Sequence, residues 1–179
     1  MNQATLSHEQ YGLLFDIRRS ARYHERRRVF FEGLHRLTSF LTILLAGGVL
    51  FELAGTGSPA PWLQWVSLGA GAMAAVDLIV GFAARATQHA GFRARYVDLE
   101  MAMVGNGDSA EVWLAHRLAR LAIERDEPPV YRALDLLCRN EMLQAEGFSR
   151  QQQPEQFSHV GWWPQLTSHV WHWQNLSVS

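Results

Sequence analysis

Two long apolar stretches dominate the pattern of hydrophobic and polar positions. Residues 37–55 contain one ionisable side chain, Glu52, and residues 62–84 contain one, Asp77. Each stretch approaches or exceeds the roughly 20 helical residues that cross a hydrocarbon core about 30 Å thick. The segment between them, Thr-Gly-Ser-Pro-Ala-Pro, is rich in turn formers and too short for any path except a fold back. The pattern therefore predicts a two-helix transmembrane hairpin.

The distribution of basic residues gives this hairpin an orientation. All 16 basic residues are arginines, and none lies between Arg36 and Arg85. Positive charge collects on the cytoplasmic side of membrane proteins, so both termini are expected there, and Trp62 and Trp65 fit an interfacial aromatic belt. A soluble bundle with the hairpin as its buried core is the alternative; span length, charge asymmetry and aromatic flanks favour the membrane.

Helical periodicity continues on both sides of the hairpin. Ser7 and Gln10 form a capping box for a helix that runs into the first span, and the second helix is expected to continue through Arg85 to Val104. Its apolar stripe, which needs a partner helix from the same chain or a neighbouring copy, consists of Phe92, Tyr96, Leu99 and Met103.

Two further helices are expected after the glycines at 105 and 107. Asp108 caps the first, whose apolar face is predicted to hold Val112, Ala115, Leu118 and Ala122 or Ile123. The second runs from about Pro129 to Glu146 and ends at Gly147. The predicted fold is all-α, with four regions: a basic cytoplasmic helix at 1–36, the hairpin at 37–84, a small cytoplasmic helical module at 85–147, and a linker with a Trp-rich amphipathic helix at 148–179.

Two groups of residues outside the spans suit a lipid interface. The tail helix is expected to end near Leu176, and an in-plane position on the inner leaflet and docking onto the protein's own bundle are equally compatible with it. The arginines beside the first span suit anionic head groups, although marking topology is the simpler role. The candidate lipid-interface residues, besides Trp62 and Trp65, are Arg26, Arg27, Arg28, Trp162, Trp163, Trp171 and Trp173.

Polar residues within the spans are the candidate functional groups, because ionisable groups are costly there. A hairpin folded about Gly57 places Glu52 opposite Gln64 near the outer interface. It places Asp77 opposite the hydroxyl groups of Thr38, Ser39 and Thr42. Asp77 can line a cation path in a homo-oligomer or hold two helices together by hydrogen bonding, and the sequence leaves both open. Close helix approach and oligomerisation are favoured by the small residues Ala70, Gly71, Ala74 and Ala75.

Composition adds little chemistry to this picture. The chain has 179 residues, a net charge of −1 and one cysteine, Cys138, so it has no intramolecular disulfide. It contains no nucleophile-elbow or phosphate-loop motif, and its only closely spaced histidines, His169 and His172, have no acidic residue or cysteine near them. We expect no enzymatic activity, no cofactor, no metal and no nucleic-acid partner.

One family combines these features. The arginine-rich segment IRRSARYHERRRVFFEGLHRLTSFL leads into the hairpin and ATQHAGFRARYVDLE follows it. From Tyr11 to Glu146 the chain resembles the SLATT family, bacterial proteins with a two-transmembrane effector domain. The resemblance implies a homo-oligomeric, pore-forming effector of the bacterial inner membrane in anti-phage defence, with a cytoplasmic protein or a nucleotide signal as partner. Asp77 and the small-residue face would carry that role; a non-conducting membrane scaffold is the alternative.

Overall fold

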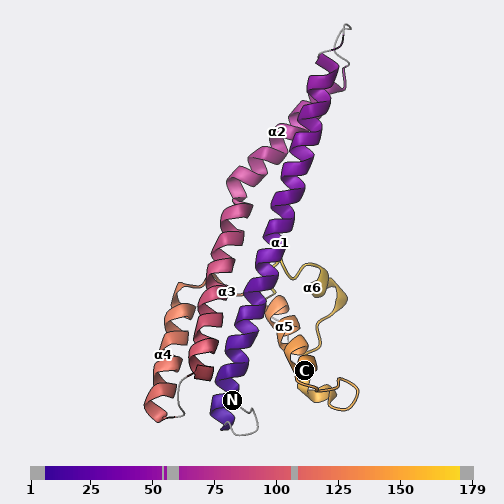
Figure 1. Cartoon of the computed structure of the whole chain (residues 1–179). Coiled ribbons are helices and arrows are strands. Elements are labelled where there is room, and N and C mark those ends of the chain that lie inside the picture. Colours follow the sequence, from indigo (N-terminus) through magenta and orange to yellow (C-terminus); the bar gives the residue numbers. More distant parts are fainter. Residues whose placement is uncertain (1–6, 54, 56–60, 106–108, 174–179) are drawn as a thin grey trace. The chain divides into compact units, whose positions relative to one another are not determined.

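A computed structural model describes residues 7–53, 55, 61–105 and 109–173, and the side chains of 51–53 lie outside this description. The secondary structure of these residues is helical, as predicted (Figure 1). The elements are α1 (His8–Leu53), α2 (Leu63–Val80), α3 (Phe82–Gly105), α4 (Ala110–Asp126), α5 (Arg132–Ala145), a 3-10 turn η2 (Pro154–Gln156) and α6 (Trp162–Leu166).

The chain divides into two compact units. Residues 28–88 form the first, called here the hairpin. Residues 1–27 and 89–179 form the second, called here the helical module. Helices α1 and α3 contribute residues to both units, and each unit is described by itself.

In the hairpin, two helices long and apolar enough to cross a membrane pack against each other (Figure 1). Phe31 of α1 packs on Phe82 and Ala86 at one end, and Leu63 is buried at the start of α2. Most of the apolar windows are nevertheless exposed. Leu78 is 85% exposed and Ile79 83% exposed. The hairpin therefore presents an apolar exterior.

The sequence predicts one continuous helix from the second apolar stretch through Val104, but the structure has two helices there, α2 and α3. Gly81 adopts the left-handed conformation (φ 66°, ψ 53°) between α2 and α3. Its N–H donates to the Asp77 carbonyl at 2.8 Å, and Arg85 Nε donates to the Val80 carbonyl at 2.9 Å. Glycine reaches this conformation without a Cβ penalty, so an isolated glycine can end a helix even within an apolar run.

The core of the helical module joins α1 to α3. Leu14 and Ile17 pack with Phe92, Tyr96 and other residues of the predicted stripe, all buried. The stripe is confirmed, and its partner is the amino-terminal helix of the same chain. Trp113 and Ile123 add α4 to this core.

Helix α4 differs from its prediction in cap and face. Its N-cap is Ser109, whose hydroxyl accepts from Val112 N–H; Asp108 lies outside the described residues. Trp113, His116 and Ile123 are buried, while Leu118 and the predicted alanines face outwards. The face is rotated because the large aromatic side chains take the interior positions, which leaves exposed the leucines Leu114, Leu118 and Leu121.

Helix α5 and the tail also depart from expectation at their ends. Helix α5 starts at Arg132, beyond the prolines, and Gly147 ends it with φ 93°, as predicted. Helix α6 stops at Leu166, and turns replace the expected helix up to residue 173; the remaining residues are not described. The side-chain amide of Asn140 holds the segment before α6 onto α5: its Nδ2 donates to the Ser158 carbonyl at 2.8 Å, and its Oδ1 accepts from the Ser158 N–H at 2.9 Å.

Candidate functional site

A groove of about 620 Å³ runs along the hairpin and is lined by five polar side chains among apolar ones. His35, Thr38, Ser39 and Thr42 reach it from α1, because spacings of three and four residues place them on one helix face. Asp77 reaches it from α2, together with Ala74 and Gly81 among others. The structure thus brings together the predicted aspartate and all three predicted hydroxyl groups.

Asp77 has a different partner from the one expected. Its Oδ2 lies 3.0 Å from His35 Nδ1, while the Thr38 hydroxyl donates to the His35 carbonyl of its own helix at 3.0 Å. A carboxylate only accepts, so His35 carries the proton on Nδ1. The sequence reasoning missed His35, although the residue precedes Thr38 by three positions and so shares its face.

The pairing sets the register of the hairpin. Asp77 lies opposite His35, about one helical turn before Thr38, the first of the three hydroxyl-bearing residues expected opposite it. His35 adjoins Arg36, the last basic residue before the apolar stretch. Asp77 consequently lies close to the arginine-bearing end of the hairpin. The predicted pairing of Glu52 with Gln64 falls outside the described side chains at Glu52, and Gln64 is exposed.

The predicted small-residue face divides into two parts. Ala70 is half-buried, whereas Gly71, Ala74 and Ala75 are exposed. Ala74 lines the groove, and Gly71 and Ala75 are exposed positions without large side chains.

The arginines predicted to meet lipid have partners within the chain. Arg26 is paired with Glu141, and Arg28 with Glu32 at 2.6 Å. Arg27 is only 3% exposed, donates to the His169 carbonyl, and lies 4.2 Å from the centre of the Tyr131 ring. Contact of Arg26 and Arg28 with lipid head groups stays a prediction. Arg27 is too deeply buried to reach a head group. Trp62 and Trp65 are exposed at the start of the second span.

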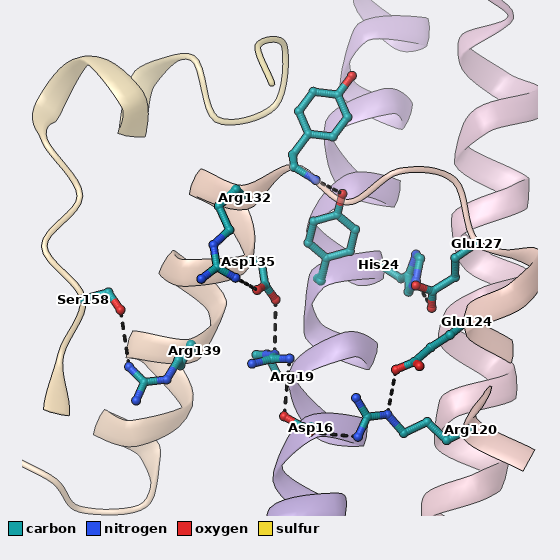
Figure 2. Close-up of polar contacts among 12 residues, drawn as sticks. Asp16, Arg19, His24, Arg120, Glu124, Glu127, Arg132, Asp135, Arg139 and Ser158 are labelled. Carbon is teal, nitrogen blue, oxygen red and sulfur yellow. Dashed lines mark hydrogen bonds and ion pairs between the residues drawn. The ribbon is translucent and has the colours of Figure 1, made fainter. Parts of the chain in front are cut away.

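A second polar cluster is buried in the helical module. His24 of α1 lies 2.9 Å from His89 of α3, Nδ1 to Nδ1. On its other side, His24 Nε2 lies 3.1 Å from Glu127 Oε1, and Figure 2 shows these two residues. The His24 ring is 1% exposed and stacks on Phe92 and Tyr96. The sequence showed no ligand spacing for these histidines, but both continue stripes of core residues, and that was the available signal.

The protonation of this cluster follows from its acceptors. Burial by itself would raise the pKa of Glu127, but the hydrogen bond from His24, with the charges of His24 and Arg120, holds that pKa below its ordinary value. The ionised carboxylate accepts from His24 Nε2–H, and of the two Nδ1 atoms one donates to the other. Aromatic rings fill the surroundings, and the cluster therefore acts as a buried brace between helices.

Ion pairs extend this brace on the side shown in Figure 2. Arg120 of α4 lies 2.8 Å from Asp16 of α1 and 2.7 Å from Glu124. Arg19 of α1 lies 3.3 Å from Asp16 and 3.2 Å from Asp135 of α5. This chain of charges links α1, α4 and α5 within the module.

The remaining candidates for chemistry are buried or packed against aromatic rings. Cys138 is fully buried, and burial raises the pKa of its thiol to about 12. Burial, then the charges of Arg27 and Arg26, lower the pKa of His169 to about 4, while the His172 ring lies against Tyr131. Among the described residues no group of three or more His, Cys, Asp or Glu side chains has a metal-binding arrangement.

Comparison of the chain with protein-family models, with curated proteins and with solved structures gives no match. What the protein does must therefore follow from its own residues. Of the two clusters, the hairpin groove is open and carries an ionisable pair, whereas the histidine cluster is closed. The groove is the candidate functional site.

Proposed function

We propose that this protein is a bacterial inner-membrane protein with both termini in the cytoplasm, and that it acts as a homo-oligomeric, pore-type effector. The observation that carries the proposal is the open groove that brings His35, Asp77 and three hydroxyl groups together on two helices apolar enough to cross a membrane. The pore would form where grooves of neighbouring copies meet.

Exposure of the apolar side chains supports insertion into a bilayer. Leu78, Ile79 and Ile43 are each more than two-thirds exposed, and they belong to a longer series along both helices. Soluble monomers rarely show apolar patches of more than a few hundred Å², because such patches aggregate. In a bilayer the same surface faces lipid at no cost. The soluble-bundle alternative needs this hairpin to be a core, and its side chains are not buried as a core would be.

The polar lining supports assembly. A carboxylate and several hydroxyl groups facing hydrocarbon carry a large desolvation penalty, so this part of the hairpin needs water or another subunit against it. The exposed Gly71, Ala74 and Ala75 permit close approach of a neighbouring helix at that place. A ring of such grooves would supply a cation-attracting path through Asp77.

Opening would be a shift between two packings of the spans. A cytoplasmic partner or signal that binds one packing better shifts the population towards it. The resemblance to SLATT proteins suggests a role in anti-phage defence and a nucleotide-dependent partner. The left-handed break at Gly81 gives the second span a point about which it can repack.

A non-conducting membrane scaffold is the second candidate. It is favoured by the pairing of Asp77 with His35 inside one chain, since a carboxylate that already has a hydrogen-bond donor does not require the water of a pore. In that case the hairpin anchors the helical module, and the module binds another protein.

Induced expression in bacteria with a membrane-potential dye separates the two candidates. We expect the wild-type protein to depolarise the membrane and Asp77→Asn to slow the loss of potential several-fold. The matched control is Asp98→Asn, which removes one exposed carboxylate from α3 of the module and should leave the loss unchanged. Equal depolarisation by Asp77→Asn would remove Asp77 from the path. Release of the protein by alkaline carbonate without detergent would refute membrane insertion altogether.

A further inference from the structure

We infer that the short segment containing α6 is a membrane-contact surface, whose exposed apolar side chains enter the interfacial layer of a lipid bilayer. These residues, called here the tail patch, are Trp162, Trp163, Leu166, Val170 and Trp171. The inference goes beyond the proposed pore and rests on it in one respect, since the hairpin would tether the module to the bilayer.

The segment is held to the module by its inner side. Trp173 packs against the buried cluster of Ala133, Leu136 and Val160, and its Nε1 donates to the Thr167 hydroxyl at 3.0 Å. Ser168 is 2% exposed, and the His169 carbonyl accepts from Arg27. The backbone between α6 and residue 173 is thus fixed by contacts that the tail patch does not use.

The outer side of the segment is apolar and uncovered. Trp162 is 75% exposed, Leu166 71% and Val170 68%. They recur every four residues, and Trp163 and Trp171 border them. Docking onto the protein's own bundle, one of the two predicted roles of the tail, therefore describes Trp173 but not the tail patch.

The chemistry of the tail favours lipid over a protein partner. No Asp, Glu, Arg or Lys follows Glu155 in the sequence, so the segment that carries the tail patch contributes no charged side chain of its own. Protein interfaces are ringed by polar groups and enriched in arginine, whereas tryptophan favours the membrane interface, where the ring is buried and the indole N–H remains hydrated. Because the segment itself contributes no basic side chain, we further expect that binding needs no anionic lipid.

The exposed leucines of α4 supply an internal comparison. Leu114, Leu118 and Leu121 are each more than half exposed, but Arg117 and Arg125 lie on the same helix among them. Such a face stays solvated without a partner. Leu118 is consequently a control position of similar exposure in the same module.

The test uses the full-length protein in vesicles of phosphatidylcholine, with Cys138→Ala as the background. A polarity-sensitive fluorophore is attached at one of three positions: Leu166→Cys in the tail patch, Leu118→Cys in α4, or Ile79→Cys in the hairpin. Quenching by spin-labelled phosphatidylcholine then reports contact with lipid. We expect strong quenching at 166 and 79, little at 118, and a several-fold weaker effect at 166 when Trp162 and Trp171 are both replaced by glutamine.

The outcomes separate this inference from the proposed function. Quenching at 79 but not at 166 overturns the membrane-contact surface and leaves the inserted hairpin standing. Quenching at 166 but not at 79 supports the surface and overturns insertion. An emission at 166 that is blue-shifted but unquenched shows a protein partner, such as a second copy, on the tail patch, and it overturns the inference.

Discussion

Replacing His24 with leucine tests the buried brace of the helical module. The change removes the imidazole that donates to Glu127 and leaves a carboxylate whose side chain is 10% exposed. Removing one partner of a buried charged pair costs about 3–5 kcal/mol. Tyr96 and Arg120 still face Glu127, so we expect a loss of about 3 kcal/mol in the free energy of unfolding. For a chain of this size that corresponds to a fall of about 6–12 °C in Tm.

The single cysteine supplies the assay. Cys138 is fully buried beside Tyr23 and Leu134, and burial raises the pKa of its thiol to about 12, so it does not react in the folded module. A thiol-reactive fluorogenic dye added during heating in detergent therefore reports unfolding of the module itself. The control is His159→Leu, an exposed histidine whose loss should change stability by less than about 0.5 kcal/mol.

The effect of pH on this brace has a defined sign. The pKa of Glu127 is lowered in the folded protein, so the unfolded chain binds the proton more tightly. The carboxylate therefore stabilises the fold above its ordinary pKa, and this contribution is lost as the pH falls through the folded pKa. The Tm difference between wild type and Glu127→Gln should shrink in acid. If His24→Leu and His159→Leu have the same Tm at neutral pH, the buried network does not stabilise the module.

Three further substitutions probe other features by thermal unfolding. Gly81→Ala should lower the free energy of unfolding by about 1–2 kcal/mol, because its left-handed backbone penalises a Cβ. Gly69→Ala in the helix interior is the control and should be neutral or stabilising by up to about 1 kcal/mol. Equal effects of the two substitutions would argue against the break between α2 and α3. Asn140→Leu removes both hydrogen bonds to Ser158 and should cost about 2 kcal/mol; an unchanged Tm would show that the segment is held by other contacts. Ser109→Ala should cost about 1 kcal/mol through the lost cap of α4, and a change below a few tenths would contradict that assignment.

The sequence was sufficient where one signal acted alone. Period and composition predicted the helical fold, and the stripe through Phe92 and Tyr96 is buried as the spacing required. The glycine at 147 ends α5 because its positive φ suits only that residue. These features depend on interactions between residues close in the sequence, so the sequence pattern alone predicts them.

Features that depend on tertiary balance could not be read in the same way. Asp77 shares a groove with the three predicted hydroxyl groups, but its bonded partner His35, one turn earlier on α1, was missed because no sequence pattern fixes which residues of two antiparallel helices face each other. Gly81 looked like one more small residue of a span, since the sequence does not distinguish a glycine in the left-handed conformation from one within a helix. The His24 and His89 pair joins positions 65 apart in the sequence, so no spacing rule reveals it.

In a hairpin inserted into a membrane as proposed above, the helix break at Gly81 also sets the hydrocarbon thickness that α2 can match. Helix α2 has 18 residues, which at 1.5 Å each cover about 27 Å, a few ångströms less than the average hydrocarbon core. A short span forces the surrounding lipid to thin or the proteins to cluster, at a fraction of a kcal/mol for each ångström of hydrophobic mismatch. In a thick bilayer the lipid itself would then press copies of this hairpin together, so acyl-chain length becomes a control on assembly that requires no ligand.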